Sequence, residues 1–558
     1  MFTLDDLKFL DSYQFLDASL DTLINNLIVS EHSFEIFNSF FKNEKNRYLL
    51  KRKGVFPYSY MDSIEKLAVK GLPPREAFFN VLTQSHITEA DYSHAKLVYR
   101  AFNCQTFGDY LKLYQNSDVI MLAEVFCSFR NTSLKWYGLD PVHYISVSEL
   151  TFDAGLKLCK IELKLLGNIN DYIWFESQMR GGICLVGKRF AKANNPLLPN
   201  SFDSSKPISY ILALDAVNLY GYAMSKPLPY GEFYWLTADE VQSFNLDDIS
   251  PDSDIGYVLE VDLEIPSSQH ERQNDWPMAP EHLTITYEML SPYSKQLCSK
   301  FNLKNTLPSK KLTPNFFPKR NYITYHLNLK FYLEQGLVLK KIHRILAFAQ
   351  KPWLREYIDF NNSKRIECKT ESEKLFFKKL NNSFYGKCLQ NVRKRINLKG
   401  ALTPESNQKY LSSSALEYFE PINENLTLFK MRKLNLILDK PIYIGFVILE
   451  ISKLKMYELY YSNFKKFYDK NCELLYTDTD SLYLHIHTNN VYEDIKNHFS
   501  HISDTSNFPQ NHLLYSGINR GKLGTLKHET CEPISEFIGL KPKMYSFLFG
   551  DNECKKNS

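Results

Sequence analysis

The segment that most constrains the fold of this chain is Leu474–Ile486, which carries two acidic residues between two apolar runs. Leu474 and Leu475 precede the acids and alternating apolar residues follow, so the pattern predicts two strands joined by a tight turn. Asp478 and Asp480 then lie at the hairpin tip, where neighbouring carboxylates repel each other unless a metal ion binds between them. In a chain with 63 acidic residues such a pair also arises by chance, so metal binding and a plain turn stay equally open for this segment alone.

Two further segments carry groups that suit the same chemistry. The apolar run Tyr210–Leu214 predicts a strand that ends in Asp215. In a helix around Lys378, residues three and four apart share one face, so Lys378, Asn382 and Tyr385 form a stripe that can bind phosphate oxygens and stack beneath a base. Each segment also has a plain interpretation, namely a strand-capping aspartate and a solvent-facing lysine.

The order of the three segments is more informative than any one of them. Joining a nucleoside triphosphate to a 3′-hydroxyl requires two divalent cations held by carboxylates from separate strands, and a positive charge that meets the phosphates. Asp215, Lys378 and the pair Asp478 and Asp480 supply these groups. Because the three plain interpretations would all have to hold together, the sequence predicts a nucleotidyl-transfer site.

The composition indicates an intracellular globular protein. A chain of 558 residues is too long for one core, and we expect roughly three to five domains. The ten cysteines form no C-x-x-C pair, which argues against a structural zinc and against a disulfide framework. No apolar run approaches the ~18 residues of a membrane span, and the acidic N-terminus does not resemble a signal peptide. The net charge of +4 does not by itself argue for nucleic acid, but basic clusters such as Lys51-Arg52-Lys53 and Arg393-Lys394-Arg395 are compatible with it.

Apolar periodicity predicts a mixed set of helices and strands. Two regions rich in polar residues, 231–320 and 396–440, look like irregular insertions. The remaining expected elements are helices at Thr3–Val29, Tyr110–Phe129 and Ile448–Tyr468, a helical stretch from Asn321 to Gly336, a strand at Leu337–Phe348, and two helices within residues 353–392.

The three segments resemble motifs A, B and C of the family B DNA polymerases. The patterns K-x3-N-S-x-Y-G and Y-x-D-T-D-S are similar to those of the protein-primed branch, and stretches such as KGVFPYSYMDSIEKL and LYGYAMSKPLPYG are most similar to its Polinton/Maverick type. The likeness runs nearly end to end. It implies an α/β (α+β) right-hand polymerase with palm, fingers and the start of a thumb, preceded by a partial ribonuclease-H-like exonuclease domain and truncated at both ends.

The resemblance also implies roles for the motif residues. Asp215 and Asp480 are the expected principal ligands of two Mg²⁺ ions, for which Mn²⁺ can substitute, and Asp478 supports them. Tyr220 is the expected steric gate against a 2′-hydroxyl. Motif B is expected to bind the nucleotide: Lys378 neutralises the triphosphate, and Asn382, Tyr385 and Gly386 line the nascent base pair.

Two more motifs are expected to bind DNA. Lys543 and Tyr545 match the K-x-Y motif that holds the primer strand, and Gly181 and Gly182 match the Y-x-G-G motif that touches the template backbone. Met179 replaces the tyrosine of that motif, which makes its contact less certain. In motif A, the residues Asn218–Gly221 stand where the family has S-L-Y-P.

The N-terminal part resembles only the later half of a 3′–5′ exonuclease domain. Tyr114 and Asp118 match its third motif, and Lys53 matches its K-x2-hydrophobic motif. Ser12 and Tyr13 lie where a ligand of single-stranded DNA is expected. The earlier D-x-E and N-x3-D carboxylates have no counterpart after Met1, and one aspartate cannot hold two metal ions, so we expect no proofreading by this chain.

The expected function is template-directed DNA synthesis, with primer and template DNA, deoxynucleoside triphosphates and a separate terminal protein as partners, no membrane, and a monomer in the nucleus. A reverse transcriptase is disfavoured because Thr479 separates the two acids. A nuclease is disfavoured because this chain lacks the upstream carboxylates. A non-catalytic DNA-binding remnant of a transposon polymerase stays open. The expected domains are a partial exonuclease-like domain at 1–135, a linker at 136–180, palm at 181–230, 321–350 and 441–535, protein-primed-specific insertions at 231–320 and 396–440, fingers at 351–395, and the start of the thumb at 536–558.

Overall fold

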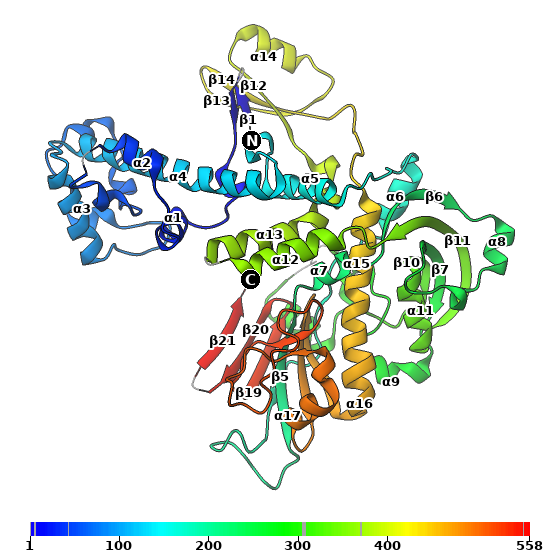
Figure 1. The fold of residues 1–558 in the computed structure, drawn as a ribbon. Helices are drawn as coiled ribbons and strands as arrows, with labels where there is room; N and C mark the ends of the chain where they lie inside the picture. Colours follow the sequence, from blue (N-terminus) through cyan, green and yellow to red (C-terminus); the bar gives the residue numbers. More distant parts are fainter. Residues whose placement is uncertain are drawn as a thin grey trace. The chain divides into compact units, whose positions relative to one another are not determined.

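The computed structural model describes residues 2–4, 7–42, 44–303, 309–368, 371–550 and 552–557, and Figure 1 shows their helices and strands. The chain forms two compact units. The first unit contains residues 1–160 and 359–384, and the second contains residues 161–358 and 385–558. The mixture of helices and strands confirms the predicted α/β class.

The first unit is built around the long helix α4 (Phe107–Tyr137), which extends the predicted helix at both ends. A capping box starts it: the Thr106 hydroxyl accepts from the backbone N–H of Asp109, whose carboxylate accepts in return from that of Thr106. Gly138, with φ of 61°, ends it in the left-handed conformation that favours glycine. The other elements of this unit are β1 (Phe2–Leu4), β2 (Leu7–Phe9), α1 (Leu20–Val29), α2 (Glu35–Phe40), α3 (Glu89–Ala101) and α5 (Val147–Cys159).

The helices α12 (Arg355–Glu367) and α13 (Glu371–Cys388) confirm the helix pair predicted for this part of the chain. Buried polar side chains of the first unit join them to α4. The Tyr137 hydroxyl donates to the amide oxygen of Asn361, and Asn361 Nδ2 donates to Asn381 Oδ1 at 2.8 Å. Since buried amides are costly to leave without partners, these bonds fix how the three helices pack.

The second unit is organised by a sheet whose main path runs β21-β20-β19-β5-β16-β15-β3. Its centre confirms two predictions, the strand that reaches Asp215 and the acidic hairpin. These strands are β5 (Ser209–Ala216), β15 (Cys472–Asp478) and β16 (Ser481–His487). The others are β3 (Cys184–Val186), β4 (Phe190–Lys192), β17 (Ser503–Asp504), β18 (Leu526–His528), β19 (Ile534–Lys541), β20 (Met544–Phe549) and β21 (Asn552–Asn557).

Both faces of this sheet are buried. Leu212 and Leu214 of β5 belong to the largest core, together with side chains of the long helix α15 (Ile442–Tyr457). Ile211 and Ala213 lie on the opposite face, in a smaller core with tyrosines of β15, β16 and β20. The helix α15 begins six residues before the predicted start at Ile448. It continues as a π-helical segment (Glu458–Lys465) and the short α16 (Lys466–Tyr468).

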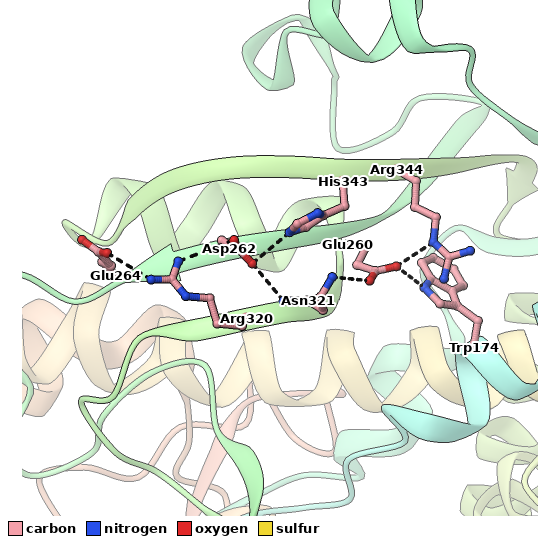
Figure 2. Close-up of polar contacts among 8 residues, drawn as sticks. All are labelled: Trp174, Glu260, Asp262, Glu264, Arg320, Asn321, His343 and Arg344. Carbon is pink, nitrogen blue, oxygen red and sulfur yellow. Dashed lines mark hydrogen bonds and ion pairs between the residues drawn. The ribbon is translucent and has the colours of Figure 1, made fainter.

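A second sheet of this unit runs in the order β10-β7-β11-β6, in which β10 is Lys319–Tyr325, β11 is Val338–Lys351 and β6 is Leu228–Trp235. Along β7 (Ile255–Glu264), alternate residues such as Leu259 and Val261 enter the largest core, which leaves the acids between them on the opposite face. Figure 2 shows that these acids meet partners from β10, β11 and α6. These contacts include Glu260 Oε2 to Arg344 Nε at 2.6 Å, Glu260 Oε2 to Trp174 Nε1 at 2.8 Å, Asp262 Oδ1 to His343 Nε2 at 2.9 Å and Glu264 Oε1 to Arg320 Nη2 at 3.7 Å.

Four sequence expectations were wrong. Residues 231–320 are not an irregular insertion: they contain β7, which lies between β10 and β11 in the second sheet, together with shorter strands and helices. The segment Thr3–Val29 begins as strands, and only its end is helical. The stretch from Asn321 continues a strand up to Tyr325 before α11 starts, because the buried tyrosines of that run face a sheet neighbour. Residues 396–440 are not irregular: they form the three-stranded sheet β12-β14-β13 and the helix α14.

The remaining elements complete the second unit. Of the helices in the described part of the chain, none is long and apolar enough to span a membrane. The bounds are α6 (Ile169–Ser177), α7 (Leu219–Met224), β6 (Leu228–Trp235), α8 (Ala238–Ser243), α9 (His270–Gln273), β8 (Glu281–Ile285), α10 (Pro292–Lys300), β9 (Ser309–Thr313), β10 (Lys319–Tyr325), α11 (His326–Glu334), β11 (Val338–Lys351), β12 (Asn397–Ala401), α14 (Pro404–Leu411), β13 (Leu416–Asn423), β14 (Leu426–Met431) and α17 (Val491–Asp494).

Candidate active site

The three predicted acids of motifs A and C meet at one end of neighbouring strands. Asp215 of β5 pairs in register with Ser481 of β16, and Ser481 also pairs with Asp478 of β15. The backbone N–H of Ala216 donates to the carbonyl of Asp480 at 2.7 Å. Residues far apart in sequence are therefore adjacent here because the antiparallel pairing of β5, β16 and β15 places their ends side by side.

Side-chain alternation assigns two of these carboxylates to the same face of the sheet. Asp215 follows Ile211 and Ala213 at intervals of two, and both of these belong to the smaller core. Asp478 likewise follows Tyr476, another residue of that core, at an interval of two. The strand ends thus present acids beyond the edge of an apolar core, where a charged ligand can reach them.

The turn that carries Asp480 is tight and strained. The Asp480 N–H donates to the carbonyl of Asp478 at 2.7 Å, and Thr479 between them has φ of 62°, a conformation that β-branched residues rarely adopt. The Thr479 N–H donates to the carbonyl of Ile183 at 2.8 Å. A Cβ placed on Gly182 would lie 2.2 Å from Thr479 Oγ1, so only glycine allows this approach.

The two predicted glycines therefore differ in their surroundings. Gly182 packs directly against the turn, whereas a Cβ on Gly181 would have no described heavy atom beyond its chain neighbours within 4 Å. The sequence pattern did not distinguish them. The contact of Gly182 with Thr479 joins residues nearly three hundred positions apart, which no local signal could reveal.

The K-x-Y residues reach the same site, Lys543 from the turn between β19 and β20 and Tyr545 from β20. Lys543 Nζ donates to Asp478 at 3.1 and 2.9 Å, and the Lys543 N–H donates to the Tyr476 hydroxyl at 3.1 Å. Hydrogen bonding to Asp478 raises the pKa of Lys543 above its usual value, although partial burial opposes the shift. Tyr545 lies deeper, with its hydroxyl 2.7 Å from that of Tyr483, and burial raises its pKa to about 12. The structure thus brings both predicted residues to the hairpin.

Tyr220, the predicted sugar gate, lies on α7 just after the end of β5. Its ring stacks on that of Tyr385, with centroids 4.1 Å apart and planes 18° apart. Burial raises the pKa of the Tyr220 hydroxyl, and Tyr385 and the carboxylates of Asp480 and Asp478 raise it further. The Tyr220 side chain therefore stays a neutral phenol, close enough to the acids for their charges to act on it.

The departure from S-L-Y-P in motif A has a local explanation. Asn218, with φ of 43°, caps α7: its side-chain oxygen accepts from the backbone N–H of Gly221 at 3.1 Å. A Cβ on Gly221 would lie 2.3 Å from Asn218 Nδ2. The two residues are thus a matched pair that starts the helix carrying Tyr220.

The acids fit the chemistry of a magnesium site only in part. Carboxylate oxygens are the ligands Mg²⁺ prefers, and it is usually bound by one or two carboxylates together with substrate phosphates. Asp215 and Asp480 supply two such carboxylates, and Asp478 forms an ion pair with Lys543. Over the described ranges, no group of three or more His, Cys, Asp or Glu side chains is arranged to hold a metal ion. Two bound metal ions therefore remain a prediction.

Motif B lies on one continuous helix, as predicted. Lys378, Asn382 and Gly386 are exposed on α13, and Tyr385 is half-buried. Lys378 and Asn382 belong to the first unit, and Tyr385 and Gly386 to the second. Tyr385 is the member that contacts the site described above, through Tyr220, and the approach of Lys378 and Asn382 to the acids stays a prediction.

The exonuclease-like residues come together inside the first unit. Lys53 Nζ donates to both the Tyr114 hydroxyl and Asp118 Oδ2, and the Tyr58 and Tyr114 hydroxyls are 2.5 Å apart. Burial, followed by the bond with Tyr58 and the charge of Asp118, raises the pKa of Tyr114. Ser12 and Tyr13 lie on a short 3₁₀ turn whose start is capped by the preceding Asp11.

Sequence reasoning missed a buried group of charges beside the glycines. Arg180 and Glu450 are 0% and 1% exposed, with Arg180 Nη2 3.8 Å from Glu450 Oε1, and Lys453 Nζ lies 3.1 Å from the same oxygen. Burial alone would raise the pKa of Glu450, but Lys453 and Arg180 hold it below its usual value. The available signal was a glutamate and a lysine three residues apart inside an otherwise apolar helical run.

The solved structures described below resemble this chain at low sequence identity. No family model and no curated protein matches the chain. Among solved structures, an orthorhombic crystal form of Phi29 DNA polymerase has a TM-score of 0.47 and 13% identity, and the match covers 98% of this chain and 70% of that one. Phi29 DNA polymerase complexed with primer-template DNA has a TM-score of 0.46 and 14% identity, covering 98% and 69%. The ternary complex of Phi29 DNA polymerase with primer-template DNA and incoming nucleotides has a TM-score of 0.46 and 15% identity, and the match covers 90% of this chain and 71% of that one.

Proposed function

We propose that this protein is a DNA-directed DNA polymerase of the protein-primed family B type. The observation that carries the proposal is the meeting of Asp215, Asp478 and Asp480 at adjoining strand ends, with the backbone of Asp480 bonded to the residue after Asp215. Lys543 and Tyr220 lie beside these acids. Carboxylates from separate strands are what two-metal nucleotidyl transfer needs, and the resemblance to family B polymerases adds a primer-side lysine and an aromatic gate.

Asp215 and Asp480 are the residues that would hold the metal ions. Bound Mg²⁺ lowers the pKa of an attacking 3′-hydroxyl and stabilises charge on a leaving pyrophosphate. Asp478 contributes by fixing the ammonium of Lys543 at 2.9 Å, close to where the primer strand ends in this scheme. Lys378 is proposed to neutralise the triphosphate, with Asn382 and Gly386 along the nascent base pair.

Selection of the sugar is assigned to Tyr220. Its ring is held from one side by the stacked ring of Tyr385, so it cannot easily move away from a bulkier nucleotide. A 2′-hydroxyl in contact with this ring would have to displace it or lose its own hydrogen bonds. Deoxynucleotides are therefore the proposed substrates, with Tyr385 placed against the incoming base.

The wider setting is proposed from the motif resemblance. Initiation uses a hydroxyl on a separate terminal protein, the element replicated is of the Polinton/Maverick type, and the monomeric enzyme acts in the nucleus. The cluster of Lys53, Tyr114 and Asp118 offers a single carboxylate, already engaged by lysine, so this chain is proposed to lack proofreading. Degradation of a 3′-labelled single strand by the purified chain, lost in Asp118→Ala, would contradict that part.

Primer extension tests the main proposal. The purified chain is given a primed single-stranded DNA template, deoxynucleotides and Mg²⁺, in parallel with Asp480→Ala and with Asp252→Ala as a matched control. Asp252 is an exposed acid in the loop before β7. We expect extension by the wild type and the control but not by Asp480→Ala. Equal signals from all three would refute the site, no extension by any would favour the DNA-binding remnant, and preference for an RNA template would favour a reverse transcriptase.

A further inference from the structure

The charges buried behind the active-site hairpin have no part in the chemistry proposed above, and they include the residue that precedes the two glycines. Arg180, Glu450 and Lys453 are 0%, 1% and 5% exposed at their side chains. Burying three charges costs more free energy than an apolar cluster of the same volume. Charged hydrogen bonds are directional, whereas apolar packing is not, so these buried charges can fix the position of the backbone that they contact.

The group holds residue 180 by both its side chain and its backbone. Lys453 Nζ donates to the carbonyl of Arg180 at 2.9 Å, which fixes the peptide that leads into Gly181. The guanidinium donates to the carbonyl of Ile323 and stacks on Tyr322, with Cζ 3.8 Å from the ring centroid. Residue 180 is therefore pinned from α15 and from β10 at once.

Glu450 is itself held in place. The Thr324 hydroxyl donates to Glu450 Oε2 at 3.0 Å, and Asn328 Nδ2 donates to the Glu450 carbonyl at 2.8 Å. The carboxylate balances Lys453, and the second bond of Lys453, to the carbonyl of Leu449 at 2.9 Å, supports the surplus positive charge. The buried group of Arg180, Glu450 and Lys453 thus joins α15, β10 and α11 around residue 180.

Two residues after Arg180, the chain contacts the turn that carries Thr479. Gly182 leaves no room for a side chain against Thr479, and the carbonyl of Ile183 accepts from the Thr479 N–H at 2.8 Å. Thr479 lies between the two acids of motif C, in a strained conformation that its surroundings have to enforce. A shift of the 180–183 segment would therefore pass directly to Asp478 and Asp480.

We propose that Arg180, Glu450 and Lys453 are positioning residues, which hold the segment 180–183 so that it clamps the turn between Asp478 and Asp480 in its working geometry. The proposal rests on the proposed function for its kinetic consequence, but the clamp itself is a property of the chain alone. Because a misplacement of about 1 Å at reacting groups can lower a rate by about 10²-fold, a loosened clamp should be visible in both dynamics and kcat.

The test compares Lys453→Met with Lys319→Met in the full chain. Lys319 is a matched control: its side chain is 0% exposed and lies in the same unit, and its ammonium bonds to Glu281 at 2.8 Å and to Asn315, not to the hairpin. Hydrogen exchange is measured over the peptides covering residues 474–486, well below the melting temperature of each variant. We expect the Thr479 amide to exchange at least about tenfold faster in Lys453→Met than in the wild type, and not in Lys319→Met. The reason is that the Ile183 carbonyl, which accepts from this amide, lies on the clamped segment.

Kinetics provide the second readout. We expect kcat for primer extension to fall by about tenfold or more in Lys453→Met with little change in the KM for deoxynucleotide, partial rescue in Lys453→Arg, and no comparable fall in Lys319→Met. Equal exchange in the two methionine variants would overturn the positioning role. If the wild type does not extend primers while the exchange difference is present, the proposed function fails and the clamp stands.

Discussion

Each unit of this molecule contains a lysine that is hydrogen-bonded to an aspartate and to a tyrosine hydroxyl. The two sites differ in the residues that surround this pair. In the first unit Lys53 meets Asp118 and Tyr114, and Asp118 comes from the middle of a helix. In the second unit Lys543 meets Asp478, but strand pairing brings two further aspartates to the same edge. A single carboxylate that is paired with a lysine cannot hold two metal ions, whereas the second site gathers three carboxylates at one edge of the sheet. The proposed polymerase chemistry is therefore placed at the second site.

Removing an acid gives the largest expected effect and tests this contrast directly. Asp480→Ala should lower primer extension by at least about 10³-fold, since a metal ligand supplies several kcal/mol to the transition state. Asp118→Ala should leave polymerase activity within about twofold, as a change outside the acid cluster. Steady-state rates with a saturating primer-template measure both. A comparable loss in the two variants would mean that the first unit contributes to synthesis in a way that the contrast omits.

One tyrosine ring from each unit, Tyr220 and Tyr114, should also differ in function. Tyr220→Val should raise the relative use of ribonucleotides by about 10²-fold, because the ring proposed to exclude the 2′-hydroxyl is gone. Tyr114→Val should not change this ratio, although both rings are held by neighbouring tyrosines. The measurement is the ratio of kcat/KM for dNTP and rNTP on one template. An unchanged ratio in Tyr220→Val would remove the gate from the proposal.

Glycines support the two sites to different degrees. A Cβ at Gly182 would lie 2.2 Å from Thr479, whereas one at Gly54 would lie 3.1 Å from the ring of Tyr114. Gly182→Ala should therefore lower the free energy of unfolding by about 1–3 kcal/mol, as expected for overpacking, and Gly54→Ala by less. Gly181→Ala serves as the control for backbone effects, since its Cβ would point into open space among the described residues. Denaturant titration of the three variants gives the order, and equal costs at 181 and 182 would contradict the clamp.

The same contrast shows which parts of the structure were accessible to sequence reasoning. The hairpin and the strand before Asp215 were predictable because alternating or continuous apolar residues flank the acids, and such patterns are local. The three-stranded sheet at 396–440 was not, because β13 is exposed along nearly its whole length and has no buried face to give it a period. The motif residues could be named from resemblance. Their partners could not, because the bond of Lys543 to Asp478 and the contact of Gly182 with Thr479 arise from strand pairing far along the chain.

The smallest expected effect concerns the lysines themselves. Lys543→Met should lower primer extension by about tenfold, because Asp478 would lose its charged hydrogen bonds and the primer end its cation. Lys53→Met should leave extension unchanged. The pKa of Lys543 is raised in the folded protein, so its bond to Asp478 contributes fully below the ordinary lysine pKa of 10.5 and is lost only as the pH rises through the folded value. The ratio of wild-type to Lys543→Met activity should accordingly stay constant between about pH 6 and pH 9, well below that window. A ratio that changes within this range would show that another titrating group, and not the lysine, controls Asp478.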